Sequence, residues 1–170
     1  MKGLFLEDIE IGSEEALGSY EFTRDAIVRF AKQFDPQPFH VDDEAARQSH
    51  FGALCASGWH TAAGWMKCYV AFNEHHRGER RARGEAIPAI GPSPGFGNLR
   101  WPRPVYAGDV IAYRSQMTDK RALKSRPGWG LLASLNEGIN QKGESVLSFE
   151  GRVLVQMRTA TGGMMNSASR

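Results

Sequence analysis

Three runs of alternating apolar residues in the last third of the chain constrain its fold more than any other feature. The first run covers residues 110–117, and turn-forming sequences follow at 126–129 (RPGW) and 140–144 (NQKGE). A period of two is typical of strands, and short turns of this kind join antiparallel neighbours. The pattern therefore predicts an antiparallel meander. One face of its second strand is expected to carry Leu131, Ala133, Leu135 and Ile139, and one face of its third Leu147, Phe149, Val153, Val155 and Met157.

A strand and a short amphipathic helix are expected near the N-terminus. Residues 14–23 predict the strand, because apolar residues alternate along it. In residues 24–34 the apolar positions recur at helical spacing, and Thr23 is a suitable N-cap. The buried side of the strand is expected to hold Ala16, Gly18, Tyr20 and Phe22, and that of the helix Ala26, Ile27, Phe30, Ala31 and Phe34.

Two further helices are expected in the middle of the chain. Residues 42–47 begin with an N-cap residue, Asp42, and suit one or two turns. Residues 57–72 predict a longer helix that is surrounded on most sides, and the polar runs at 75–83 and 87–95 predict a loop. The longer helix should bury a stripe of Trp59, Ala62, Ala63, Met66, Tyr69 and Val70, with Thr61, Gly64 and Cys68 on its small side.

These elements imply an α+β domain in which one curved antiparallel sheet wraps around a long central helix. Of the 170 residues, 41% are hydrophobic, which suits a single core, so we expect one domain over residues 1–158. Residues 159–170 lack any pattern and are expected to be disordered. The net charge of +2 argues against nucleic acid as a partner.

The cysteines and the longest uncharged window bear on location. Cys55 and Cys68 have no Cys-x-x-Cys spacing, and no secretory leader precedes them, so we expect reduced thiols in a cytoplasmic protein. Residues 48–66 carry no charge but include polar side chains and three glycines. We therefore expect buried protein there and no membrane span.

A carboxylate, two prolines and a histidine follow one another after the first helix. Pro36 and Pro38 separate Asp35 from His40, and their fixed φ angles limit the freedom of the connecting loop. An imidazole exchanges protons near neutral pH, and a carboxylate can orient it or a water molecule. Gly58 stands at the start of the long helix, where free N–H groups favour negative charge.

Two stretches resemble a known family. The pattern Asp35-x-x-Pro38-x-His40-x-Asp42, followed by Phe51-Gly52 and Ala56-Ser57-Gly58, resembles the hydratase motif of the MaoC-like acyl dehydratases, the family of (R)-specific enoyl-CoA hydratases. The segment LRWPRPVYAGDVI at 99–111 is similar to a strand and turn that these proteins carry after the central helix. The resemblance covers residues 5–158 and implies a hot-dog fold.

The resemblance also implies an activity. Asp35 and His40 correspond to the catalytic carboxylate and imidazole, and Gly58 to the residue whose N–H faces the thioester carbonyl. The expected reaction interconverts a trans-2-enoyl and an (R)-3-hydroxyacyl thioester of coenzyme A, with the acyl-carrier-protein thioester as the alternative substrate, in fatty acid metabolism. No separate cofactor and no metal are expected, since coenzyme A is part of the substrate. Residues expected to contact substrate are Pro38, Phe39, Ser57, Trp59, Arg100 and Arg103.

Partners and rival functions follow from the same comparison. A single hot-dog domain leaves a sheet edge and one side of its helix open, and such domains pair, so we expect a homodimer or an assembly of dimers. The rival enzyme is a hot-dog thioesterase, which would direct water to the carbonyl carbon. The rival of another class is a non-catalytic subunit that binds acyl-CoA.

Several polar residues have simpler roles. Helix capping explains Asp42, and Ser57 is a better N-cap than nucleophile. Residues 91–95 match the G-x-S-x-G pattern of a nucleophile elbow, but Pro94 lacks the N–H that an elbow uses, so we reject it.

The basic run and the remaining histidines complete the set. The arginines of the expected loop at 75–83 are solvated or, alternatively, bind coenzyme A phosphates; they are Arg77, Arg80, Arg81 and Arg83. The pair His75 and His76 lacks a metal-ligand spacing. We expect His50 and His60 to serve packing or turns.

Overall fold

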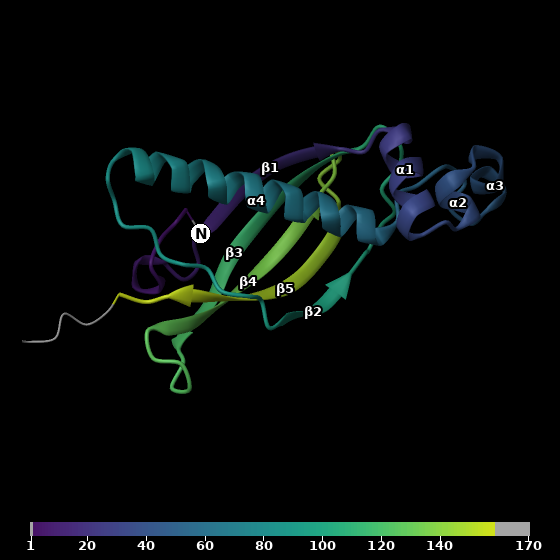
Figure 1. Cartoon of the computed structure of the whole chain (residues 1–170). Helices are drawn as coiled ribbons and strands as arrows, with labels where there is room; N and C mark the ends of the chain where they lie inside the picture. The colour runs from purple at the N-terminus through teal and green to yellow at the C-terminus, as the bar shows by residue number, and fades with distance from the viewer. Residues whose placement is uncertain (1, 159–170) are drawn as a thin grey trace, which may run out of the picture.

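The computed structural model describes residues 2–158, which form one five-stranded antiparallel sheet and a long helix that lies across it (Figure 1). The strands follow the order β1-β3-β4-β5-β2. They are β1 (Glu14–Glu21), β2 (Gly95–Arg100), β3 (Val110–Ala122), β4 (Trp129–Ile139) and β5 (Ser145–Gln156). The helices are α1 (Arg24–Phe34), α2 (Pro38–Val41), α3 (Asp43–Gln48) and α4 (Gly58–Ala82), after a 3-10 turn, η1 (Leu6–Asp8). This is the α+β hot-dog architecture that the sequence predicts. The expected tail at 159–170 lies outside the described residues.

The meander is confirmed. Strands β3, β4 and β5 pair consecutively and antiparallel, and the two predicted turns join them. Strand β2 pairs with β5 on its other side and forms one edge of the sheet. The predicted core face of β5 is also confirmed, since Leu147, Phe149 and Val155 are buried.

The central helix turns its small side, and not the expected apolar stripe, toward the sheet. Gly64 is buried there, and a Cβ on it would lie 2.7 Å from the hydroxyl oxygen of Tyr113. That hydroxyl donates a hydrogen bond of 2.8 Å to the Thr61 carbonyl oxygen, deep in the core. The prediction of the buried stripe was therefore wrong. At Tyr113 the sheet supplies the bulky side chain and the helix a small one, Gly64, whereas Trp59, Met66 and Val70 remain about half exposed.

Strand β4 faces the opposite way from the prediction. Its buried positions are Gly130, Leu132, Asn136 and Gly138, whereas the expected face is only half buried. A Cβ on Gly138 would lie 2.9 Å from the Tyr113 ring, so this ring fills the space that a larger residue would take. The buried amide of Asn136 is satisfied because Ser115 Oγ donates to its oxygen at 2.7 Å.

A bulge changes the face of β1 in mid-strand. The register against β3 shifts between Ala16 and Gly18, so that Leu17 enters the core and its two neighbours are exposed. Beyond the bulge Phe22 is buried, as predicted. The predictions for Ala16 and Gly18 were wrong, because strict alternation does not anticipate an extra residue.

Helix α4 extends ten residues beyond the predicted end, through most of the segment expected as a loop. Side chains three or four positions apart pair along this polar part, as in His76–Glu79 and Arg77–Glu74. Such pairs stabilise a helix that has no continuous apolar face. The helix ends at Ala82, and Gly84 follows with φ of +70°, a conformation that favours glycine after a helix.

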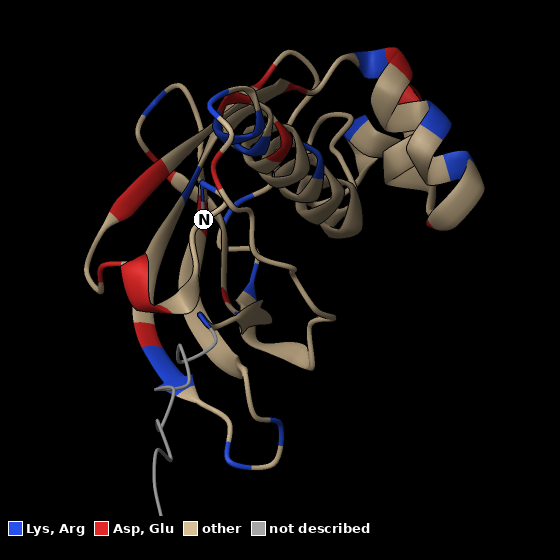
Figure 2. Cartoon of the chain, turned by 60° about the vertical axis from the view of Figure 1, so that its left-hand side comes forward, with Lys and Arg blue, Asp and Glu red and all other residues tan. Residues whose placement is uncertain are grey.

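Charges of both signs are mixed over the molecule. Lys or Arg and Asp or Glu occur on the same elements, in the helices and in the sheet (Figure 2). This arrangement fits the small net charge and gives no support for a nucleic-acid surface. Within residues 2–158, no helix combines the length and the apolar character required to cross a membrane.

Candidate active site

Helices α1 to α3 form a small lobe beside the N-terminal end of α4 (Figure 1). Helix α1 is capped by Thr23, which accepts from Ala26 N at 3.2 Å, and it ends at Asp35 as predicted. Its expected face is confirmed for Ala26, Ile27 and Ala31, which are buried, but Phe34 is 63% exposed. The short helix α2 then presents His40.

The start of α4 is fixed by a segment that is distant in sequence. Ala56 N donates to the Val105 carbonyl oxygen at 2.7 Å, and Cys55 forms an isolated bridge with Tyr106. The Tyr106 hydroxyl donates to the Phe51 carbonyl oxygen at 3.0 Å. The two stretches that carry the family resemblance therefore lie against each other.

The imidazole of His40 is buried, and its hydrogen bond defines its tautomer. Its Nδ1 lies 2.7 Å from the Cys55 carbonyl oxygen. Because a carbonyl oxygen only accepts, Nδ1 must carry the proton, and the neutral ring presents a lone pair at Nε2. This Nε2 lies 3.6 Å from Asp35 Oδ2, a separation that suits one bridging water better than a direct hydrogen bond.

The carboxylate of Asp35 is held by polar neighbours. Gln37 Nε2 donates to Asp35 Oδ1 at 2.9 Å, which leaves Oδ2 for the side of His40. Partial burial raises the pKa of Asp35, but hydrogen bonds from Ser57 and Gln37 and the nearby His40 outweigh burial, so the pKa is lowered overall. Asp35 is therefore an anion at neutral pH and serves as an acceptor.

The N-terminus of α4 has one unused amide beside this pair. Ser57 is the N-cap, as expected: its Oγ accepts from Trp59 N, and its carbonyl oxygen accepts from His60 N and Thr61 N. The Gly58 N–H has no acceptor among residues 2–158. The space beside Gly58 is not open, however, because a Cβ there would lie 2.6 Å from the indole of Trp101.

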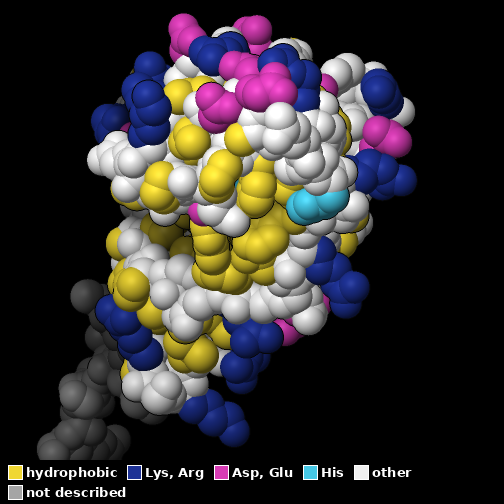
Figure 3. Space-filling view, turned by 90° about the vertical axis from the view of Figure 1, so that its right-hand side faces the viewer, with side chains coloured by type: hydrophobic (Ala, Val, Ile, Leu, Met, Phe, Trp, Pro, Cys, Tyr) yellow, Lys and Arg dark blue, Asp and Glu magenta, His cyan; other side chains and the backbone are white. Residues whose placement is uncertain are grey.

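Asp35, His40 and Gly58 line one cavity of about 460 Å³, which we call the catalytic cavity because it contains the expected catalytic residues. Of the residues expected to contact substrate, it is also lined by Phe39, Ser57, Trp59 and Arg103. Pro38 begins α2 and Arg100 ends β2, and neither is among its lining residues. On the face toward this end of the molecule, hydrophobic side chains gather in a hollow with Lys and Arg side chains around it (Figure 3).

Gln37, Cys55 and Trp101 line the cavity beside Asp35, His40 and Gly58 but were not among the site residues expected from the sequence. Gln37 could have been found, because an amide two residues from a carboxylate is a common local partner. The Cys55 carbonyl and the Trp101 indole could not, because they reach the cavity only through tertiary contacts. The thiol of Cys55 is no nucleophile here, since burial raises its pKa to about 11.

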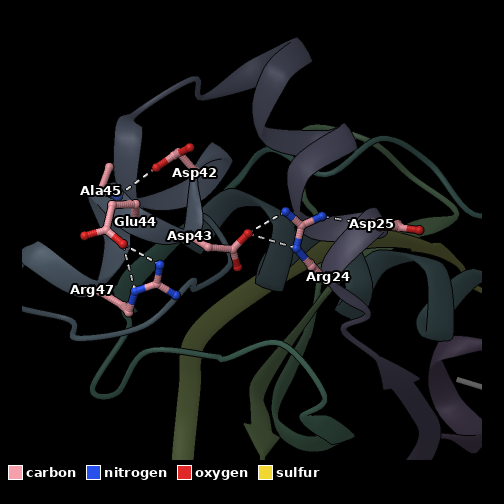
Figure 4. A network of polar contacts seen from close by, with 7 residues as sticks. All are labelled: Arg24, Asp25, Asp42, Asp43, Glu44, Ala45 and Arg47. Atoms are coloured by element: carbon pink, nitrogen blue, oxygen red, sulfur yellow. Dashed lines mark hydrogen bonds and ion pairs between the residues drawn. The ribbon is translucent and has the colours of Figure 1, made fainter.

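An ion pair on the surface ties the lobe together. Arg24 Nε on α1 donates to Asp43 Oδ2 on α3 at 3.0 Å (Figure 4). Asp42 caps α3 by accepting from Ala45 N at 2.7 Å, which confirms the capping interpretation (Figure 4). Both ends of the segment that carries Asp35 and His40 are thereby anchored.

The predicted basic loop is helical and distant from the catalytic cavity. From Gly58 to Arg80 the α4 axis spans about 33 Å, at 1.5 Å per residue. Arg80 and Arg83 both pair with Glu85, and Arg77 donates to the Pro88 carbonyl oxygen at 3.0 Å. These arginines do not line the cavity of their own chain.

The other histidines lie outside the cavity. His60 stacks on Phe30 at a centroid distance of 4.5 Å, as the packing interpretation predicts. His75 and His76 both contact Glu79 on the exposed surface of α4. The ring nitrogens and carboxylate oxygen of these three residues that could bind a metal lie within 4.8 Å of one another. Ser93 exchanges hydrogen bonds with the backbone of Gly95 in an exposed loop, so it is no nucleophile elbow.

Comparison with known proteins agrees with this fold. Residues 14–128 match the model of the MaoC-like domain family, and the chain belongs to that family. It is 30% identical over 153 residues to the uncharacterized protein YdeM of Bacillus subtilis, covering 90% of this chain and 98% of that protein.

Solved structures show the same architecture. The MaoC-like dehydratase from Rhodospirillum rubrum is 36% identical, with a TM-score of 0.77 over 92% of this chain and 99% of that one. The R-hydratase PhaJ1 from Pseudomonas aeruginosa is 19% identical, with a TM-score of 0.65 over 91% and 86% of the two chains. At that identity the second likeness concerns the fold.

Proposed function

We propose that the protein hydrates trans-2-enoyl-CoA thioesters to (R)-3-hydroxyacyl-CoA, or catalyses the reverse dehydration. Family membership supports chemistry of the hydratase and dehydratase class. The observation that carries the proposal is the pair of Asp35 Oδ2 and His40 Nε2, 3.6 Å apart, beside the free N–H of Gly58. The R-hydratase among the similar structures supports the (R) configuration.

In the forward direction, a water molecule held between Asp35 and His40 attacks C3 of the enoyl group. His40 Nε2 accepts a proton from this water as the C3–O bond forms, and the C2–C3 π electrons shift toward the thioester oxygen. The Gly58 N–H, reinforced by the helix dipole, stabilises that oxyanion. The proton on His40 then passes to C2, which regenerates the neutral ring and balances the addition of one water.

The division of roles follows from the two environments. Asp35, with a lowered pKa, remains ionised and stabilises the imidazolium that forms on His40. The Cys55 carbonyl holds the His40 ring in the tautomer that presents Nε2. General acid–base help contributes about 10²- to 10⁴-fold and one oxyanion donor about 10²- to 10³-fold.

The first test follows two products in the same sample. Loss of the enoyl-thioester absorbance without release of free thiol supports hydration of crotonyl-CoA. Release of free thiol in step with the loss of that absorbance would replace the proposal with a thioesterase, because hydrolysis of the thioester also removes the enoyl-thioester conjugation. Binding of the thioester with neither change would replace it with a non-catalytic subunit. No metal or separate cofactor takes part in the proposed reaction.

We also propose that the working form is a homodimer, or an assembly of such dimers. Trp59, Met66 and Val70 lie on one side of α4 and are 50–54% exposed, and Phe96 on the edge strand β2 is 59% exposed. Apolar residues on a helix beside an open sheet edge suit a second copy of the same surface. Light scattering should give twice the chain mass for the wild type and a lower mass for Met66→Glu. Equal masses would remove this face from the interface.

A further inference from the structure

A second cavity lies next to the catalytic cavity along α4. It measures about 120 Å³ and is lined by apolar side chains of α4, β2 and β5, among them Ala62, Met66 and Leu99. We call it the apolar cavity. A further hollow of about 140 Å³ shares Trp65, Met66 and Phe96 with it. Hollow space therefore continues along α4, away from the catalytic residues, although Ser134, Asn136 and Arg152 also line the further hollow.

Trp59 is the residue that the two cavities share. Its side chain lines the catalytic cavity and the apolar cavity, and among the described residues no other lines both. It is 54% exposed and meets the Trp101 ring edge to face, with centroids 5.3 Å apart. In this conformation Trp59 stands as a partition between the catalytic residues and the apolar space.

We infer that Trp59 determines the acyl-chain length that the site accepts, by separating the catalytic cavity from the apolar cavity. The inference rests on the proposed hydration. With Trp59 in place, a short acyl group fits within the catalytic cavity. A longer chain requires that this indole move or be removed, after which the alkyl tail enters the apolar cavity.

The length of the added space follows from the helix. From Gly58 to Met66 the α4 axis advances about 12 Å. An extended alkyl chain advances roughly 1.3 Å per carbon, given C–C bonds of about 1.52 Å. The opened space would therefore accept roughly eight to ten carbons. The lining of the apolar cavity contains no polar residue, which suits an alkyl tail and not coenzyme A.

The test compares kcat/KM for crotonyl-CoA, octenoyl-CoA and decenoyl-CoA in the wild type and in Trp59→Ala. We expect the decenoyl to crotonyl ratio to rise at least about tenfold in the variant. Adding Ala62→Leu, which refills the apolar cavity, should return the ratio toward the wild-type value. Val110→Ala is the matched control, because Val110 is a 42% exposed apolar residue of β3 that lies outside the proposed dimer face and lines neither cavity. Its ratio should equal that of the wild type.

Each outcome has a distinct meaning. If the wild type hydrates crotonyl-CoA and Trp59→Ala keeps the wild-type ratio, the inference is wrong and the proposed function stands. If the wild type hydrates no enoyl-CoA of any length, both the proposed function and the inference about Trp59 are wrong. Trp59→Leu provides the same comparison should Trp59→Ala not fold. A ratio that rises equally in Val110→Ala would assign the effect to the loss of any exposed apolar side chain and would overturn the role of Trp59.

Discussion

Gly58→Ala tests how closely Trp101 covers the start of α4. The new Cβ would lie 2.6 Å from Trp101 Cε2 and 2.7 Å from Cδ2, so the indole must retreat by about 1 Å to reach an ordinary contact. Overpacking of this kind costs about 1 to 3 kcal/mol. Because Trp101 is 40% exposed and free to move outward, we expect a value near 1 kcal/mol. That corresponds to a melting temperature about 2–4 °C lower.

The double variant separates the steric effect from the chemical one. In a Trp101→Ala background, Gly58→Ala meets no indole and should cost no stability, which gives a coupling of about 1 kcal/mol. Because alanine retains the backbone N–H, any loss of activity in Gly58→Ala should come from the displaced indole. We therefore expect kcat/KM for crotonyl-CoA to be lower in Gly58→Ala than in the wild type, and equal in Trp101→Ala and the double variant. Thermal denaturation and kcat/KM measure both effects. Equal losses in the two backgrounds would refute the contact.

Three further predictions concern pH, the N-terminal segment and metals. Burial, reinforced by the charge of Arg29, lowers the pKa of His60 to about 4. The unfolded chain therefore binds more protons below about pH 6.5, and stability falls as the pH drops from there toward 4, by about 2 kcal/mol at pH 5. In urea titrations, the free energy of unfolding of His60→Phe should fall by about 2 kcal/mol less between pH 7 and pH 5 than that of the wild type. The same fall in both proteins would contradict this prediction. Lys120 Nζ donates to the carbonyl oxygens of Leu6, Glu7 and Ile9 at 3.2, 2.8 and 2.6 Å. Lys120→Met should therefore lower the free energy of unfolding by about 1–3 kcal/mol. A melting temperature equal to that of the wild type would contradict this prediction. Dialysis against a chelator should leave the rate of hydration unchanged. A loss of activity on dialysis that added zinc restores would disprove a metal-free reaction.

The sequence predicts the elements better than their faces. Period and turn residues act locally, so the meander and α1 could be placed from the chain alone. The inner face of β4 could not, because it depends on the ring of Tyr113 that occupies the space beside Gly138. Likewise, the polar half of α4 is helical through pairs such as His76–Glu79, which a hydrophobic pattern does not reveal.

Likewise, local sequence predicts one part of the candidate site and not the other. Asp35 and His40 are five residues apart with two prolines between them, so their proximity was predictable from local geometry. The partner of His40 is the Cys55 carbonyl, and the cover over Gly58 is Trp101. Both contacts depend on how the segment before α4 pairs with the segment after β2, a tertiary arrangement that no local pattern encodes.

The most direct test of the account is kcat/KM for hydration of crotonyl-CoA in Asp35→Asn, His40→Ala and the double variant, with circular dichroism to verify folding. If the two side chains act on one water, kcat/KM should fall about 10²- to 10⁴-fold in each single variant. In the double variant it should fall little further than in the less active of the two single variants. Losses that multiply, or full activity in the double variant, would contradict a shared water between Asp35 and His40.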